Sequence, residues 1–167
     1  SSLMSVRMAA QAIKAGEGDV FIAAGVETVS RFVHGFADSG PQNTKHAAAV
    51  ARTAEFSGGG QGAWTPFQGG LPDVYIAMGQ TAENVATYKG VTREEQDEYA
   101  ALSQQRATAS LENGFWENEI TPVTTTDDEG NAVVVTKDDG IRAGTTAEGL
   151  AGLKPVFRPD GTVTAGN

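Results

Sequence analysis

Cysteine is absent from the 167 residues of this chain. The chain therefore contains no disulfide, no thiolate metal ligand and no cysteine nucleophile. Basic residues are also few, because 12 Lys and Arg stand against 21 Asp and Glu and give a net charge of -9. This balance argues against a nucleic-acid-binding surface, which needs clustered cations to neutralise phosphates. A small anionic ligand could still bind at a local basic spot or at a helix N-terminus.

Long apolar runs are missing as well. No run approaches the roughly 20 residues that a membrane-spanning helix requires, and the start lacks the basic and apolar regions of a signal peptide. We therefore expect a cytoplasmic protein that does not enter a membrane. There is no initiator Met, and Ser1 opens directly into a helical pattern, so we expect the true N-terminus to lie elsewhere. The apolar content of 40% is typical of a globular protein.

The first 25 residues predict a buried helix followed by a buried strand. Apolar residues cover most of the circumference of residues 1–15, which is typical of a helix enclosed on all sides. The polar stripe is narrow and consists of Arg7, Gln11 and Lys14. Residues 20–25 form a continuous apolar run between turn residues, as in a strand buried within a parallel sheet. Together these two elements form half of a βαβ unit and indicate an α/β fold.

The middle of the chain changes character. Residues 30–72 are rich in Gly and Pro with weak periodicity, so we expect a long loop of the kind that is often functional or mobile. Residues 73–89 predict a helix with Asp73 as N-cap, ended by Gly90. Its expected core face consists of Tyr75, Met78, Ala82 and Val85.

Thr92 and Glu95 form a capping box that opens a helix to about residue 113. Residues 120–126 and 132–136 predict a hairpin around the turn 127–131. Residues 162–165 have the composition of a strand start.

Several motifs fit less specific roles better than chemical ones. Residues 58–63 match the dinucleotide pattern G-x-G-x-x-A, but no strand precedes them and no helix follows, so we interpret them as a flexible loop. The acidic residues 127–129 lack the spacing of a calcium-binding EF-hand loop and favour a solvated turn. His34 and His46 have no carboxylate or Ser at a catalytic spacing, and a surface position is expected for each. Met78 by itself is most simply a core methionine.

Four runs of sequence, taken together and in order, resemble the thiolase family. They are Ser1-Ser2-Leu3 with the helix that follows, residues 24–30 (AGVETVS), residues 78–86 (MGQTAENVA), and the pair 153–157 (LKPVF) and 161–167 (GTVTAGN). The resemblance covers the whole chain. It implies a five-layered α/β fold built from two similar halves. Of this fold the chain would supply part of the N-terminal half, with a buried helix and strands of a mixed sheet, plus an α+β loop domain.

The same resemblance implies a domain division and an activity. Residues 1–29 would end the N-terminal half, residues 30–155 would form the loop domain over the CoA site, and residues 156–167 would return to the N-terminal half. The implied reaction is acyl transfer between acyl-CoA and acetyl-CoA, by Claisen condensation or by thiolysis of a 3-ketoacyl-CoA, through a cysteine thioester. That cysteine would lie two positions before Ser1, where a helix N-terminus favours a thiolate.

The implied partners are CoA thioesters as substrates, the remainder of the same polypeptide, and further copies of it in a dimer or tetramer. No metal or separate cofactor is expected. Asn167 matches an asparagine that holds a water in an oxyanion hole, and Met78 matches a methionine of the acyl pocket. Gly149, followed by Leu150 and Ala151, stands where many thiolases have a serine that contacts the pantetheine arm.

One cation of the family pattern is also missing, because residues 127–130 replace an arginine near the adenine. Lys137 or Arg142 would then have to serve the CoA phosphates.

Alternatives remain open at this point. The protein could be an acetyl-CoA acetyltransferase or a degradative 3-ketoacyl-CoA thiolase, and the long Gly-rich loop and Gly149 favour a degradative enzyme of fatty acids or sterols. A different class is a non-catalytic CoA- or lipid-binding relative without the nucleophile. Because a buried-type helix and an open sheet edge are unstable alone, we expect the chain to associate with the rest of the enzyme or to order only its loop domain.

Overall fold

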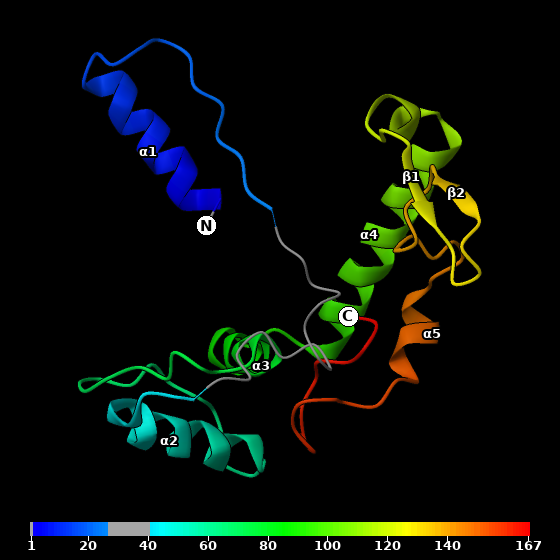
Figure 1. Ribbon diagram of the computed structural model, residues 1–167. Coiled ribbons are helices and arrows are strands. Elements are labelled where there is room, and N and C mark those ends of the chain that lie inside the picture. The colour runs from blue at the N-terminus through cyan, green and yellow to red at the C-terminus, as the bar shows by residue number, and fades with distance from the viewer. Residues whose placement is uncertain (1, 27–40) are drawn as a thin grey trace. The chain divides into compact units, whose positions relative to one another are not determined.

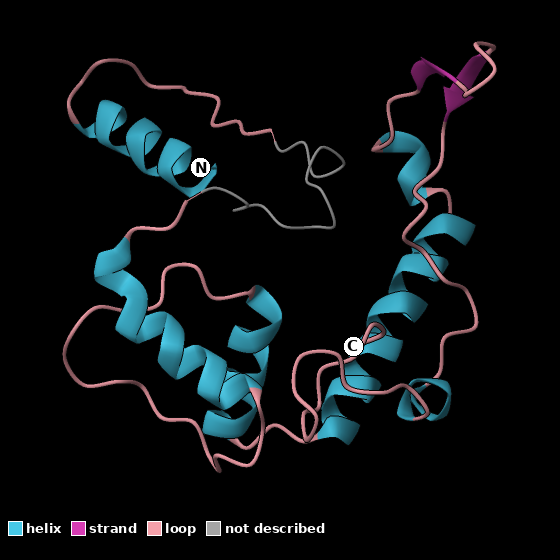
Figure 2. Cartoon of the chain, turned by 60° about the horizontal axis from the view of Figure 1, so that its bottom comes forward, coloured by secondary structure: helices cyan, strands magenta, loops and turns pink. Residues whose placement is uncertain are grey.

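The computed structural model describes residues 2–26 and 41–167 (Figure 1). The chain divides into two compact units, Ser1–Pro41 and Gln42–Asn167. The predicted domain boundary near residue 30 and His34 lie outside the described residues. Helices account for most of the regular structure, and the only ladder among the described residues is one short hairpin (Figure 2).

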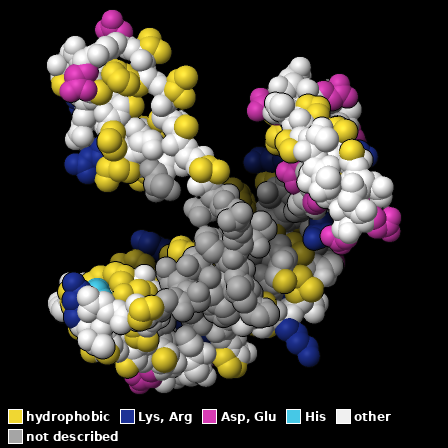
Figure 3. All heavy atoms as spheres, viewed as in Figure 1, with side chains coloured by type: hydrophobic (Ala, Val, Ile, Leu, Met, Phe, Trp, Pro, Cys, Tyr) yellow, Lys and Arg dark blue, Asp and Glu magenta, His cyan; other side chains and the backbone are white. Residues whose placement is uncertain are grey.

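The first unit contains helix α1 (Ser2–Lys14), which confirms the predicted helix. The helix ends two residues before Gly16, whose φ of 75° suits a left-handed C-terminal turn. The predicted burial is wrong for this chain, because none of the residues of α1 is buried and Leu3 is 83% exposed. Figure 3 shows hydrophobic side chains at the surface of this unit. A helix becomes buried only where a second apolar surface covers it, and the described residues of this unit provide none.

Residues 20–25 have no regular secondary structure and do not form the predicted strand. Ile22 is 94% exposed, and the backbone of Ala24 accepts a hydrogen bond from Ser5 Oγ at 3.1 Å. A β-strand requires a hydrogen-bonding neighbour, and no described residue pairs with this segment. The apolar pattern that predicts a buried strand is present, but the described part of the chain supplies no neighbouring strand for it.

The second unit begins with helices in a region where the sequence predicts a long loop. The 3-10 helix η3 (Thr44–His46) leads into helix α2 (Ala47–Ser57). The Ala-rich stretch at 47–54 has high helix propensity. This signal is weak when residues 30–72 are considered together, because Gly and Pro surround the stretch. The predicted surface position of His46 is wrong. This side chain is buried, with Nδ1 3.0 Å from the Pro72 carbonyl oxygen and its ring edge-on to Tyr75.

Helix α3 (Met78–Lys89) begins five residues later than predicted. Asp73 is not its N-cap, because Asp73 Oδ1 accepts a hydrogen bond from the backbone N–H of Tyr75 at 2.9 Å and closes a turn ahead of the helix. Gly90 ends α3 with a φ of 67°, as predicted.

The capping box is present, since Thr92 and Glu95 bond each other's backbone N–H groups at the start of helix α4 (Arg93–Glu112). After α4 follow η4 (Phe115–Asn118), strand β1 (Val123–Thr126) and strand β2 (Ala132–Val135). The strands pair antiparallel, with Val123 opposite Val135. The predicted hairpin is therefore confirmed.

The turn between the strands is held by Asp127. Its carboxylate accepts hydrogen bonds from the backbone N–H groups of Asn131 and Glu129. These bonds, those of Asn131 first, hold the pKa of Asp127 below its ordinary value.

The last elements are helix α5 (Ala147–Ala151) and the segment 156–167, hereafter the return segment. The predicted strand start at 162–165 lacks a ladder. The backbone N–H groups of Thr162 and Val163 instead bond to the carboxylate of Glu83, so a side chain takes the place of a neighbouring strand. Among the described residues, no helix has the length and apolar character needed to cross a lipid bilayer.

Candidate functional site

Three parts of the second unit meet around the first turns of α4. Helix α5 packs against α4, and the return segment reaches the same place through its last residue, Asn167. Four of the five predicted site residues lie in these parts: Gly149, Leu150, Ala151 and Asn167. The structure therefore brings together residues that are separate in the sequence.

Arg93 forms the hub of this meeting point. Its Nη2 donates to the carbonyl oxygens of Leu150 at 2.8 Å and Leu153 at 3.0 Å, and its Nε donates to Asp97 Oδ2 at 2.8 Å. Leu150 belongs to the last turn of α5 and Leu153 lies two residues beyond its end, and a cation is favourable near a helix C-terminus.

Asp97 continues the network to Asn167. Asp97 is 2% exposed, and its Oδ1 accepts a hydrogen bond from Asn167 Nδ2 at 2.7 Å. A buried carboxylate is tolerated when it is paired and hydrogen-bonded, and both oxygens of Asp97 are used in this way.

The side-chain amide of Asn167 is held on three sides. Nδ2 donates to Asp97 and to the Thr162 carbonyl oxygen at 3.0 Å, while Oδ1 accepts from the backbone N–H of Thr164 at 2.7 Å. Both N–H donors are thus occupied. A water bound by this amide would use the second lone pair of Oδ1.

Helix α5 presents the predicted pantetheine-contacting residues. The N–H of Gly149 is bonded to the Thr146 hydroxyl at 3.1 Å and is therefore not free to bind a ligand. Leu150 is buried, whereas Gly149 and Ala151 are exposed. Gly166 lies so close to Leu150 and Leu153 that an added Cβ would overlap them, which ties α5 to the end of the return segment.

Met78 is the first residue of α3 and is 77% exposed, so the prediction of a core methionine is wrong. The predicted core face is wrong as well, since Val85 is exposed and the buried residues of α3 are Gln80, Glu83, Asn84 and Ala86. An exposed Met78 is available for contact with a ligand or with another part of the protein.

Glu83 is a key residue that the sequence pattern missed. It is 2% exposed. Its carboxylate accepts from the backbone N–H of Thr162 at 3.0 Å and of Val163 at 2.8 Å. We call this arrangement the Glu83 clamp. A second bond from Gln80 Nε2 to the Phe157 carbonyl oxygen strengthens the same junction between α3 and the return segment.

A signal for this buried face is present in the sequence. Gln80, Glu83 and Asn84 stand at the spacing i, i+3, i+4, which places them on one face of a helix. The face carries no basic residue one turn from Glu83, so the carboxylate has to find its partners elsewhere.

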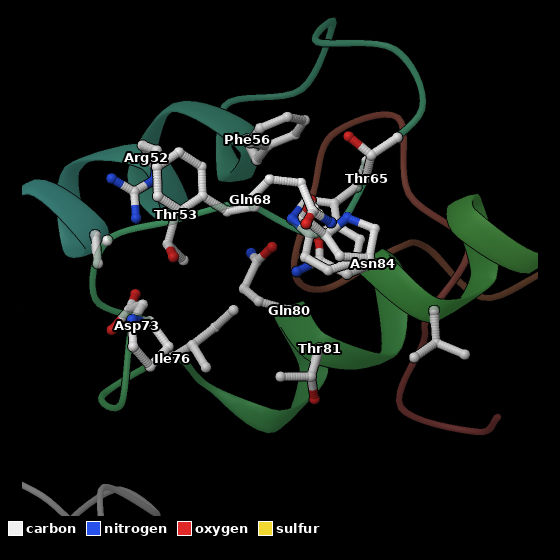
Figure 4. A pocket seen from close by; sticks show the side chains of 17 residues that line it. Arg52, Thr53, Phe56, Thr65, Gln68, Asp73, Ile76, Gln80, Thr81 and Asn84 are labelled. Atoms are coloured by element: carbon white, nitrogen blue, oxygen red, sulfur yellow. Dashed lines mark hydrogen bonds between the residues drawn. The ribbon is translucent and has the colours of Figure 1, made fainter.

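A recess of about 790 Å³ lies between α2, α3 and the segment 64–73 (Figure 4). Its walls include the aromatic rings of Phe56, Trp64 and Phe67, with the Arg52 guanidinium 3.8 Å from the centre of the Phe67 ring. Asn84 also lines it and is 8% exposed, and its side-chain amide has no hydrogen bond to any residue that the structure describes. The recess therefore offers mainly apolar walls with an amide to orient a polar group.

The two cations proposed for CoA phosphates remain accessible. Lys137 and Arg142 are exposed. Within residues 41–167 neither side chain forms an ion pair or hydrogen bond, and the hydrogen bonds of Arg142, with Gln104 and Thr145, are made by its backbone. Their charges are free to meet an anion.

Comparison with known proteins gives one consistent result. The family model described as the N-terminal domain of thiolase matches residues 1–167. The beta-ketoadipyl-CoA thiolase of Acinetobacter baylyi is 44% identical to the chain over 171 residues, an alignment that covers 100% of the chain and 40% of that relative. The chain thus spans about two fifths of the length of the curated relatives it matches.

Solved structures agree. The crystal structure of the Bacillus anthracis acetyl-CoA acetyltransferase superposes with a TM-score of 0.67 at 36% identity and covers 100% of the chain and 39% of its own. The dimeric peroxisomal thiolase of Saccharomyces cerevisiae superposes with a TM-score of 0.70 at 32% identity and covers 100% and 37%. The α/β fold class predicted from the sequence is confirmed by these likenesses.

Proposed function

The chain belongs to the thiolase family, as part of its N-terminal domain, and from this premise we propose that the whole protein is an acyl-CoA thiolase. The observation that carries the proposal is the match of the family model from the first residue to the last. A hydrogen-bond network that links α5 and Asn167 through α4 supports it. The relatives bear the names of thiolases and acetyl-CoA acetyltransferases.

The proposed reaction proceeds through a covalent thioester. A cysteine thiolate attacks C3 of a 3-ketoacyl-CoA, the bond between C2 and C3 breaks, and acetyl-CoA leaves after its C2 carbanion takes up a proton. The thiol of a second CoA then takes the acyl group and restores the cysteine. Dividing the transfer in this way lowers each barrier. The nucleophile and its acid–base partners belong to parts of the protein outside this chain.

The residues of this chain would supply binding and positioning. The exposed Met78 would line the acyl site, and α5 would support the pantetheine arm through its exposed Gly149 and Ala151. Asn167 would hold a water through Oδ1, and that water would donate to the oxyanion that develops on the attacked carbonyl. Lys137 and Arg142 would attract the CoA phosphates.

Assembly is part of the proposal. The named yeast relative is dimeric, and we propose that this protein also functions as a homo-oligomer, with CoA thioesters as its substrates and with the loop domain over the CoA site. The proposed reaction uses no separate cofactor, because the thioester carbonyl of the substrate stabilises the C2 carbanion that forms when the bond between C2 and C3 breaks.

The test is a thiolysis assay of the full-length protein. Purified enzyme is mixed with a 3-ketoacyl-CoA and free CoA, and acetyl-CoA is quantified by chromatography. We expect turnover that disappears when the residue two positions before Ser1 is changed from cysteine to alanine. A natural residue other than cysteine there, or wild-type protein that binds CoA thioesters without cleaving them, would contradict the enzyme and favour a binding protein.

A further inference from the structure

We propose that the recess between α2, α3 and the segment 64–73 receives the acyl group of the substrate, and that this group is uncharged and carries a ring with an oxygen substituent. This inference rests on the proposed function and names the class of acyl group that the enzyme cleaves. The size of the recess, its aromatic and uncharged lining and the buried amide of Asn84 carry it (Figure 4).

The recess is large for a short acyl group. Its volume of about 790 Å³ lies within the range of about 300–1,000 Å³ that is usual for pockets of drug-sized ligands. An acetoacetyl group would occupy only a small part of this volume and leave apolar walls in contact with water. The free energy that their burial supplies would then be lost. The size therefore favours a bulky acyl group.

The walls favour a ring over a flexible chain. Phe56 belongs to α2, whereas Trp64 and Phe67 belong to the segment 64–73, so two elements contribute aromatic rings to the recess. Trp64 is held edge-on to Tyr88, with 6.2 Å between the ring centres. Aromatic side chains pack well against other rings, and a rigid group loses less conformational freedom on binding than an alkyl chain does.

The lining of the recess carries no net charge. Arg52 and Asp73 are the charged residues among the described ones that line it, and their charges are opposite. The Arg52 guanidinium donates to the Leu71 carbonyl oxygen at 3.1 Å and covers the Phe67 ring, and the Asp73 carboxylate accepts from the backbone N–H of Tyr75. Since the cation is already engaged, an acyl group that ends in a carboxylate would be poorly matched here.

Asn84 supplies the polar contact. It is 8% exposed, and its amide forms no hydrogen bond with any residue that the structure describes. A buried polar group without a partner is costly, and an oxygen on the bound ring would remove this cost. A hydroxyl or a keto oxygen is suitable, because the amide nitrogen donates and the amide oxygen accepts.

The recess also adjoins the residue proposed for the acyl site. Ile76 and Thr81 line the recess and stand two residues before and three residues after Met78. Met78 begins α3, so the first turn of this helix carries both the exposed methionine and part of the wall. An acyl group bound at Met78 would therefore have the recess within one helical turn.

The experiment measures thiolysis by the full-length enzyme with acetoacetyl-CoA, 3-ketooctanoyl-CoA, 3-ketoadipyl-CoA and 3-keto-5-phenylpentanoyl-CoA. The last is cleaved between C2 and C3 to acetyl-CoA and 3-phenylpropanoyl-CoA. We expect its kcat/KM to exceed that of each of the others by about tenfold or more. A hydroxyl at position 2, 3 or 4 of the phenyl ring should raise kcat/KM further, by about tenfold for at least one isomer.

Two variants test the recess directly. T53W adds bulk to its wall, and A54W adds the same side chain at the neighbouring exposed position of α2 as the matched control. We expect T53W to lower kcat/KM for the phenyl substrate about 10- to 100-fold relative to acetoacetyl-CoA, and A54W to keep the wild-type ratio. N84L removes the amide at similar volume and should abolish the preference for a hydroxylated ring.

A binding measurement supplements the kinetics. The chain contains two tryptophans, so W116F leaves Trp64 as its reporter at the recess. The product 3-phenylpropanoyl-CoA should change the emission of Trp64, whereas CoA alone should not. The melting temperature identifies any variant that fails to fold, and the fluorescence test remains valid if T53W is such a variant.

The outcomes are distinct. The inference is overturned if a linear or dicarboxylic substrate is cleaved as well as the ring-bearing ones, or if folded T53W and A54W have the same selectivity. Either result leaves the thiolase proposal intact. Failure to cleave any of the substrates would refute the proposed function, and the inference with it.

Discussion

Glu83 shows how a single carboxylate can replace an element of secondary structure. It is enclosed within the second unit and receives two backbone N–H groups of the return segment, which a neighbouring strand would otherwise satisfy. Buried backbone donors need partners, and a charged acceptor forms stronger hydrogen bonds than a neutral one. The junction between α3 and the return segment therefore depends in part on this buried carboxylate.

Replacing Glu83 by glutamine should lower the free energy of unfolding by about 1–3 kcal/mol. The amide keeps the shape of the side chain but directs a donor at a backbone N–H, so at least one buried group loses its partner. Urea denaturation of wild type and E83Q measures the difference, with E98Q, an exposed change in α4, as control. Equal stability of E83Q and E98Q would show that the clamp contributes little.

Asp160 gives a pH dependence with a defined sign. Its Oδ2 accepts the backbone N–H of Gly60 at 2.8 Å, and this bond first, with the nearby Arg158, holds the pKa of Asp160 below 3.8. A carboxyl group with a depressed pKa in the folded state stabilises the protein at pH above 3.8, and the stabilisation is lost as pH falls through the folded value.

We therefore expect D160N to be less stable than wild type near neutral pH, and the gap to narrow below pH 3.8. Thermal denaturation as a function of pH measures this, and D139N, at an exposed aspartate, controls for net charge. A gap that widens in acid would refute the role given to Asp160.

Some site residues could be predicted from the sequence and others could not. Met78, Gly149 and Asn167 lie within runs that resemble a family, so resemblance alone identifies them. Glu83 and Asp97 have partners 79 and 70 residues away, and no local pattern encodes such a distance. An apolarity pattern also assigns burial to the wrong face of α3, because the buried face is polar and is satisfied by the return segment.

At the scale of elements, the sequence correctly predicts the features that depend on residues close together in the chain. The capping box of α4, the glycine that ends α3 and the β1–β2 hairpin depend on residues within a few positions of one another, and all were predicted. The strands expected at 20–25 and 162–165 depend on distant neighbours. Residues 20–25 are exposed to solvent, and the backbone of residues 162–165 is hydrogen-bonded to a side chain.

The capping box can be tested by T92A. Alanine cannot accept the Glu95 N–H, which Thr92 Oγ1 now accepts at 3.2 Å, so the first turn of α4 loses a cap. We expect a loss of about 1 kcal/mol in unfolding free energy, measured by urea denaturation. T136A, at an exposed position outside helices and strands, serves as the control and should be near neutral. A T92A variant as stable as T136A would show that other contacts hold this turn.

At the scale of the whole chain, the first unit exposes large apolar residues. In the first unit Leu3, Met4, Val20 and Ile22 are all exposed. Exposed apolar patches of this kind mark surfaces that another part of a protein or another copy covers. This agrees with a chain that spans about two fifths of its relatives' length.

We expect the isolated 167-residue chain to bind the dye ANS and to self-associate, and a version lacking residues 1–41 to do so less. Size-exclusion chromatography with dye fluorescence compares the two. Trp64 and Trp116 both lie in the second unit and report on its folding in either version. A monomeric full chain without dye binding would mean that the first unit buries its apolar residues by itself.

The Glu83 clamp also defines where this protein can change in length. It joins positions 79 residues apart, so α4, the hairpin and α5 form one excursion tied at its base. The free energy of closing such a loop grows only logarithmically, by about 0.6 kcal/mol for each doubling of its length. Extra residues at the exposed tip 127–131 would therefore leave the base almost undisturbed. This tip is the place to insert an epitope or a fluorescent reporter without displacing the residues that meet at α4.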